Sequence, residues 1–193
     1  LARKVVSAYF AVPKEQRAKG LRVTCSASSF VPKPFTPFQW APMNSQADFR
    51  EKAYKTRQGI ISQLNQKSIK YNWHEADVTV LEGVLARGDR RLSKAILHVY
   101  QNGGFYDAWS EFFDFDRWKK AFEVCGIDID FYTKRIRHED EIFPWDFIDV
   151  GVSKEFMLRE WKNALSEKVT PNCRMQCSGC GAKQFGGGVC YED

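Results

Sequence analysis

The fold is decided by residues 21–30, which read Leu21-Arg22-Val23-Thr24-Cys25-Ser26-Ala27-Ser28-Ser29-Phe30. This stretch is rich in β-branched and small residues, which favour a strand whose short side chains face a crowded interior. Residues 1–10 carry a helical pattern, with Val5, Val6, Tyr9 and Phe10 on one side. Helix, loop and strand in this order form the unit of an α/β fold.

Four prolines follow the predicted strand within the twelve residues 31–42. Proline fixes its own backbone, removes a hydrogen-bond donor and restricts the residue before it to extended conformations. We therefore predict a stiff, extended surface loop here rather than another strand.

The remainder of the chain reads mostly as helices. Helical spacing occupies residues 47–67, and residues 68–73 form a short strand-like run. Five further helices are predicted, with Asp89, Asp114 and Ser153 as N-caps, over residues 75–87, 89–102, 114–125, 128–135 and 153–168. The predicted fold class is an α/β fragment followed by a mostly α region. Its predicted divisions are residues 1–45, a helical region 46–170 and a Cys-rich tail 171–193.

The composition is typical of a folded protein, with 44% hydrophobic, 15% aromatic and 27% charged residues among 193. No run of about 18 apolar residues occurs, and the first residues lack the features of a secretion signal. We therefore expect a cytoplasmic protein without a membrane partner. Residues 1–70 hold 13 Lys and Arg against 3 Asp and Glu. Such a region could meet RNA phosphates, although a solvated basic helix face is the simpler interpretation.

Four of the six cysteines form the pattern Cys173-x3-Cys177-x2-Cys180-x9-Cys190. Two thiolates separated by two residues can reach one ion, and the neighbouring glycines let the backbone turn beneath the sulfurs. Four thiolates suit either zinc or an iron–sulfur cluster, and the spacing does not separate the two. The pattern predicts a metal site that orders a polar tail, rather than disulfide bonds.

Other reactive side chains form weaker patterns. Cys25 and Cys125 read as small core residues, and no nucleophile–histidine set is apparent. His74 precedes Glu75 and Asp77 at a spacing that matches no metal-binding helix motif, so these acids are better explained as charges at a helix start. The aromatic and acidic residues 103–116 read as a packed connection rather than a ligand pocket.

The order of several segments resembles the carboxy-terminal part of an uncharacterised bacterial family of radical S-adenosylmethionine (SAM) proteins. Members of this family have a degenerate cobalamin-binding-like region before the radical barrel. The resemblance extends over nearly the whole chain and rests on residues 29–40 (SFVPKPFTPFQW), 81–92 (LEGVLARGDRRL), 144–156 (PWDFIDVGVSKEF) and the cysteine tail. The first segment alone is less specific, because related radical enzymes also carry it.

The resemblance implies that residues 1–45 are the last helix–strand unit of the radical SAM barrel and that the rest of this barrel is the chain's partner. The exit from the barrel rim would place Lys33, Thr36, Gln39 and Trp40 at the substrate opening. A 4Fe–4S cluster and SAM are implied for the parent protein. The catalytic cluster motif is not in this chain, so this portion alone is expected not to be catalytic.

The first three tail cysteines have the spacing of the family's catalytic cluster motif. That motif precedes most of the barrel, whereas only thirteen residues follow Cys180. The resemblance therefore implies an auxiliary or structural centre at the tail, either zinc or a second iron–sulfur cluster. Relatives have a shorter interval before the last cysteine, so Cys190 is the least secure ligand.

A second interpretation belongs to another functional class. In it the chain is a non-enzymatic, metal-containing module, and its tail and basic front bind RNA or a ribosome-associated partner. The family's substrate is unassigned, so the resemblance names a reaction class and no reaction.

Overall fold

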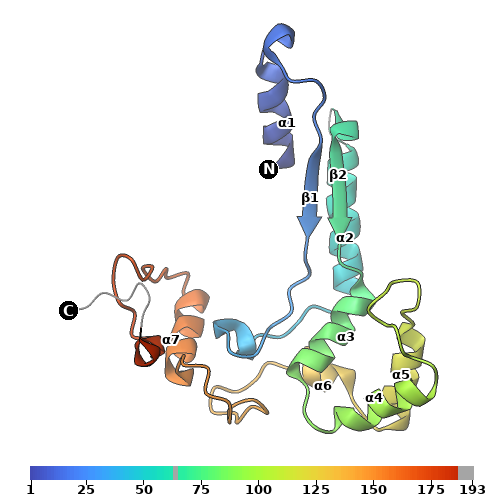
Figure 1. Cartoon of the computed structure of the whole chain (residues 1–193), viewed down its shortest axis with the longest axis vertical. Coiled ribbons are helices and arrows are strands. Elements are labelled where there is room, and N and C mark those ends of the chain that lie inside the picture. Colours follow the sequence, from blue (N-terminus) through green and yellow to red (C-terminus); the bar gives the residue numbers. More distant parts are fainter. Residues whose placement is uncertain (63–64, 187–193) are drawn as a thin grey trace. The chain divides into compact units, whose positions relative to one another are not determined.

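The computed structural model describes residues 1–62 and 65–186 (Figure 1). Within them the chain is mixed α/β, with seven α-helices and a two-stranded parallel sheet. It divides into two compact units. Unit 1 holds Leu1–Phe30 and Asn44–Val80, and unit 2 holds Val31–Met43 and the chain from Leu81 onward. The α/β start and the helical continuation predicted from the sequence are confirmed.

Unit 1 is built around a parallel pair of strands. Figure 1 shows the arrows of β1 and β2 side by side and pointing the same way, with Val23 opposite Ile69 and Ala27 opposite Trp73. Parallel neighbours need a long crossover, which here contains the helix α2. α1 packs on β1, and α2 packs on β2. The elements of unit 1 are α1 (Ala2–Ala11), β1 (Val23–Ala27), α2 (Gln46–Ile61) and β2 (Ile69–Trp73).

The start of α2 is fixed by a capping box. The Ser45 hydroxyl accepts from the backbone N–H of Asp48 at 3.1 Å, and the Asp48 carboxylate accepts from the backbone N–H of Ser45 at 2.8 Å. These two bonds satisfy donors that a helix start leaves unpaired. The helix ends at Ile61, earlier than predicted, and a short 3-10 turn (Gln66–Ser68) leads into β2.

The remaining helices are α3 (Ala76–Arg87), α4 (Leu92–Gln101), α5 (Phe115–Val124), α6 (Ile129–Thr133) and α7 (Lys154–Leu165). Two predicted N-caps are confirmed: Asp114 accepts from the second and third residues of its helix, and Ser153 accepts from Phe156 N–H. Asp89 does not cap directly, because α4 begins three residues later. Its carboxylate instead accepts from Arg91 N–H at 2.9 Å.

The prediction of a surface loop for the proline-rich segment is wrong at several of its residues. The segment contains a 3-10 turn (Pro37–Trp40), and Pro32 and Trp40 are fully buried. It packs against α7 within unit 2. Trp40 of this segment is buried because it belongs to a hydrophobic core. The buried members of that core are Trp40, Phe143, Trp145 and Met157.

The prediction of a packed connection at residues 103–116 is wrong for four aromatic side chains. Phe105, Tyr106, Trp109 and Phe112 each expose more than half of their surface. Tyr106 contacts Trp109 edge-on and Phe112 at a tilt, and Phe105 contacts Tyr100 edge-on. An exposed aromatic group of this kind is unusual on a folded surface.

No helix within residues 1–62 and 65–186 is long and apolar enough to cross a lipid bilayer.

Candidate functional site

A cavity of about 260 Å³ opens at the carboxyl ends of the two parallel strands in unit 1. Ser28 and Ser29 directly follow β1, and His74 directly follows β2. The strand ends are tied together by the backbone N–H of His74, which donates to the carbonyl oxygen of Ala27 at 3.3 Å. The polar residues that line the cavity are Ser28, Ser29, Asn44, Lys52, Thr56 and His74.

One wall of this cavity is aromatic. The rings of Tyr71 and Trp73 stack with their centroids 5.2 Å apart, because alternate residues of a strand point to the same face. No carboxylate is among the residues that line the cavity, whereas Lys52 supplies a positive charge. A planar wall beside hydroxyl, amide, imidazole and ammonium groups suits a ligand with a flat part and hydrogen-bond acceptors or negative charge.

Two of the four residues predicted to line a substrate opening are buried in the core of unit 2. Trp40 has no exposed surface and packs on Phe143, with ring centroids 5.6 Å apart. The side-chain oxygen of Gln39 accepts from Trp145 Nε1 at 2.8 Å and from the backbone N–H of Phe35 at 3.2 Å. In this arrangement both side chains hold the proline-rich segment in place.

The other two predicted residues lie nearer the surface. Lys33 forms an ion pair with Glu82, and the Thr36 hydroxyl donates to the Lys33 carbonyl oxygen at 2.8 Å. The structure thus separates the four residues into two buried core members and two more accessible ones. Whether any of them contacts a substrate stays a prediction.

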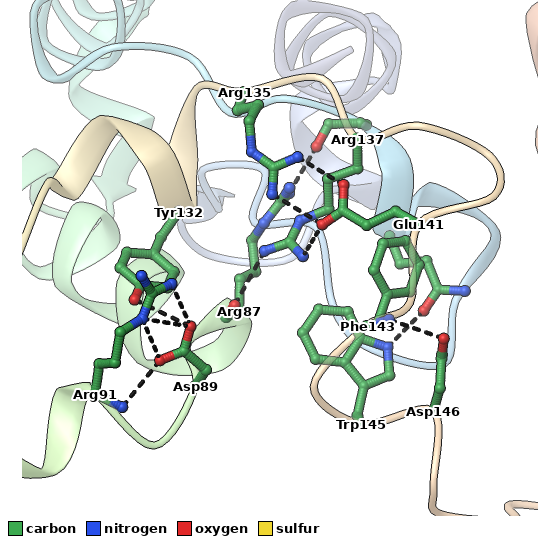
Figure 2. A network of polar contacts seen from close by, with 12 residues as sticks. Arg87, Asp89, Arg91, Tyr132, Arg135, Arg137, Glu141, Phe143, Trp145 and Asp146 are labelled. Carbon is green, nitrogen blue, oxygen red and sulfur yellow. Dashed lines mark hydrogen bonds and ion pairs between the residues drawn. The ribbon is translucent and has the colours of Figure 1, made fainter.

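A group of three arginines and one glutamate joins α3 to the segment after α6 (Figure 2). Arg135 donates to both carboxylate oxygens of Glu141, at 2.6 and 2.8 Å, and Arg137 donates to one of them at 3.1 Å. Arg137 also donates to the carbonyl oxygen of Arg87 at 3.1 Å. Arg87 itself donates to the carbonyl oxygen of Ala41 at 2.6 Å. We call Arg87, Arg135, Arg137 and Glu141 the arginine cluster.

Burial and like charges act together on this cluster. Arg87 is 1% exposed and Arg137 is 4% exposed. Desolvation, reinforced by the neighbouring Arg137, lowers the pKa of Arg87 to about 10. Burial also lowers the pKa of Arg137. The hydrogen bond from Arg135 and the two nearby guanidinium charges hold the pKa of Glu141 below its usual value. All four groups are therefore charged at neutral pH.

A second polar group in Figure 2 is more balanced. Arg91 donates to both carboxylate oxygens of Asp89, and the Tyr132 hydroxyl donates to the same carboxylate at 3.2 Å. The hydrogen bond from Arg91 lowers the pKa of Asp89 to about 2. Burial, followed by the Asp89 charge, raises the pKa of Tyr132. Here one cation meets one anion, and the group ties the start of α4 to α6.

The predicted metal ligands Cys173, Cys177 and Cys180 are free thiols at or near the surface, and Cys190 lies outside the described residues. In residues 1–62 and 65–186, no three His, Cys, Asp or Glu side chains gather so that they could hold a metal ion. As placed, the three thiols do not fit a metal-ligand set. The metal centre is therefore still a prediction.

The tail is nevertheless attached to unit 2. The backbone N–H of Ser153 donates to the carbonyl oxygen of Cys180 at 2.9 Å. The ring of Phe185 packs so closely on Gly151 that a Cβ there would lie 1.8 Å from a ring carbon. Gly151 also has a φ of 76°, which favours glycine.

The remaining reactive residues are separate from one another. Cys25 lies in β1 and Cys125 ends α5, and both are partly buried. Asp77 accepts hydrogen bonds from Gln46 and from Arg50, the latter at 2.8 Å. Asp77 also lies in the first turn of α3, where the helix-start interpretation places it.

Sequence reasoning missed the arginine cluster and the cavity at the strand ends. Arg135 and Arg137 lie six and four residues before Glu141, and this spacing indicated ion pairing. No pattern in the nearby sequence predicted that Arg137 would contact Arg87. The cavity depends on the pairing of β1 with β2, which are more than 40 residues apart. Comparisons found no match to this chain among family models, curated proteins or solved structures.

Proposed function

We propose that this chain is the carboxy-terminal portion of a radical SAM iron–sulfur enzyme of unassigned substrate. In this proposal α1 and β1 are the last helix–strand unit of the barrel, β2 adds a parallel strand beside β1, and unit 2 contains the helical carboxy-terminal region. The observation that carries the proposal is the parallel pairing of β1 and β2 with a polar cavity at their carboxyl ends.

A parallel pair of strands has little stability by itself. Parallel sheets are normally covered on both faces, and isolated two-stranded sheets are marginally stable at best. No residue of β1 or β2 is fully buried, since each strand has only half-buried and exposed positions. The preceding strands of a barrel would pair with the outer edge of β1 and help to cover these surfaces.

The position of the cavity favours an enzyme. In parallel α/β folds, ligands bind outside the carboxyl ends of the strands, where loops bring polar side chains together. In unit 1 this end carries the hydroxyls of Ser28 and Ser29, the imidazole of His74 and the ammonium group of Lys52. We propose that these four residues contact the substrate. Lys33 and Thr36 of unit 2 are proposed as substrate-binding residues on the resemblance alone. Gln39 and Trp40 would position the segment that leaves the barrel.

The cofactors belong to the parent protein in this proposal. Within the described residues, no set of three thiols is assembled for a 4Fe–4S cluster. The cluster and SAM are therefore expected to be held by residues upstream, where their chemistry is the reductive cleavage of SAM. The residues of this chain would bind and orient the substrate. Zinc or an auxiliary iron–sulfur cluster at the tail is a separate proposal.

The RNA-binding alternative receives less support from the geometry. Two of the basic side chains on α2 are already paired, because Arg50 contacts Asp77 and Lys55 contacts Glu51. This pairing lowers the charge that α2 presents to phosphates. The stacked Tyr71 and Trp73 rings are the feature that an RNA base would use.

The test is SAM cleavage by the parent protein. The parent is purified without oxygen, its iron is reconstituted, and a chemical reductant supplies the electron for cleavage of SAM to methionine and 5′-deoxyadenosine. We expect 5′-deoxyadenosine from the parent and none from a control whose upstream cluster cysteines are replaced by alanine. Absence of cleavage, together with salt-sensitive RNA binding by this chain, would favour the alternative.

A further inference from the structure

The arginine cluster lacks both negative charge and hydrogen-bond acceptors. Arg135 and Arg137 both contact the single carboxylate of Glu141, whereas Arg87 donates only to the carbonyl oxygen of Ala41. Within the cluster, three positive charges therefore face one negative charge. The neighbouring pair shows the difference, because Arg91 and Asp89 balance one cation with one anion. The other hydrogen bonds of the cluster go to backbone carbonyl oxygens (Figure 2). Arg87 donates to that of Ala41, and Arg137 donates to that of Arg87.

Several buried N–H donors in this region have no acceptor. They are Nε and Nη2 of Arg87 and the Nε atoms of Arg135 and Arg137. The indole Nε1 of Trp40 is also without an acceptor, and the carbonyl oxygen of the same residue accepts from the backbone N–H of Arg137. Buried polar groups are nearly always hydrogen-bonded, since an unpaired one costs about 1–3 kcal/mol and more when it is charged.

Loss of a proton does not relieve the cluster at neutral pH. The pKa of Arg87 is lowered only to about 10, so its guanidinium stays positive. Water molecules could accept hydrogen bonds from the orphan donors, but they would leave the two excess charges buried. An oxyanion would supply acceptors and negative charge together, and guanidinium groups bind oxyanions through parallel N–H donors.

We propose that the arginine cluster binds a phosphate group. A phosphate carries a charge near −2 at neutral pH, which matches the excess of the cluster. Arg135 and Glu141 retain 30% and 21% of their side-chain exposure and form the accessible face of the cluster. Arg87 and Arg137 lie behind them as the buried donors. This site is independent of the function proposed for unit 1.

A larger cavity adjoins the cluster and offers room for the rest of a ligand. It has a volume of about 880 Å³ and is lined by Gly88, Asp89, Arg90, Arg91 and Phe143, among others. Gly88 directly follows Arg87, and the ring of Phe143 lies 5.3 Å from the guanidinium carbon of Arg137. Asp89 balances the charge of Arg91 in this cavity, so its net positive charge comes from Arg90. The ligand class is therefore a phosphate monoester, with inorganic phosphate as its simplest member.

The test measures phosphate binding by the chain. Binding of inorganic phosphate and of phenyl phosphate is followed by calorimetry and by thermal unfolding, against chloride at equal ionic strength. We expect saturable binding and a rise in unfolding temperature with phosphate only. Phenyl phosphate binding more tightly than inorganic phosphate would indicate a ligand that extends into the cavity, and equal affinities would indicate free phosphate.

Two variants distinguish a phosphate site from a structural ion-pair group. Glu141→Gln removes the competing carboxylate, so it is expected to tighten phosphate binding about tenfold even though it weakens the fold. Arg135→Gln removes an accessible donor and is expected to weaken binding about tenfold. Arg117→Gln, which alters a partly buried arginine in α5, is the control and should leave affinity unchanged. Phosphate effects no larger than those of chloride, or weaker binding in Glu141→Gln, would overturn the proposal.

Discussion

Arg87 donates a hydrogen bond from Nη1 to the carbonyl oxygen of Ala41 at 2.6 Å, and so fastens the proline-rich segment to the end of α3. Arg137 completes the connection, because its backbone N–H donates to Trp40 and its Nη2 donates to the carbonyl oxygen of Arg87. These bonds explain why Val31–Met43 belongs to unit 2 although the preceding residues, up to Phe30, belong to unit 1.

Replacement of Gly83 by alanine should destabilise unit 2. A Cβ at this position would lie 2.2 Å from the sulfur of Met43, so the buried Met43 side chain would have to move and repack. Overpacking of this kind costs about 1–3 kcal/mol in the free energy of unfolding. The measurement is chemical denaturation, and the loss should shrink when Met43 is also replaced by alanine.

Gly59→Ala is the matched control for that substitution. Gly59 lies in α2, and nothing comes within 4 Å of a Cβ built there. Alanine is a better helix former than glycine, so this variant should gain about 0.5–1 kcal/mol. A similar loss in both variants would show that the contact with Met43 is not the cause.

Replacement of Gln39 by leucine should destabilise the core around Trp145. The change leaves the indole N–H of Trp145 and the backbone N–H of Phe35 without their acceptor. Two buried orphan donors are expected to cost about 2–4 kcal/mol, measured by denaturation followed through tryptophan fluorescence. Thr36→Val, which removes a hydrogen bond at the surface, should lose less than about 1 kcal/mol. If Gln39→Leu were as stable as the native chain, a role in the core would be refuted.

The ion pair of Asp89 predicts a loss of stability in acid. The pKa of Asp89 falls from 3.8 to about 2 on folding, so the folded state favours its charged form. Its contribution is complete above pH 4 and is lost as the pH falls towards 2, through the folded pKa. Asp89→Asn should lack this component. The check is the unfolding temperature of both proteins between pH 5 and pH 2, and parallel curves would contradict the prediction.

The cysteine tail predicts a metal in protein prepared without oxygen. Elemental analysis should give about one zinc or about four irons per chain for the tail, because four thiolates hold either centre. Cys177→Ser should lose most of this metal, whereas Cys125→Ser, at the end of α5, should keep it. Equal metal contents in these two variants, or disulfide bonds among the tail cysteines, would refute the predicted centre.

Local signals in the sequence were sufficient to locate the helices and strands, although not all of their ends. Asp114 and Ser153 stand where helix starts leave N–H groups unpaired, and both cap the predicted helices. The strand at residues 23–27 was readable from its β-branched and small residues. Such patterns depend on neighbours a few positions away, so they can be recognised without knowledge of the tertiary structure.

Long-range pairing was not readable in the same way. Prolines at 32, 34, 37 and 42 predicted an extended backbone, whereas the structure has a 3-10 turn at Pro37–Trp40. The burial of Trp40 depends on Phe143, more than 100 residues later. The arginine cluster likewise joins Arg87 to Glu141 through partners from three separate segments. The charge and hydrophobicity of a residue indicate which kinds of contact it can make. Which residue it contacts depends on the fold.

The most direct test concerns the outer edge of β1, because the proposed function places a further parallel barrel strand beside it. Amide hydrogen exchange is compared between this chain and the parent protein, at the amides of residues 23–27 that do not pair across the β1–β2 ladder. We expect these amides to exchange rapidly in the chain alone and at least about a hundredfold more slowly in the parent, where neighbouring strands would protect them. Equally rapid exchange in both proteins would contradict the assignment of this sheet to a barrel.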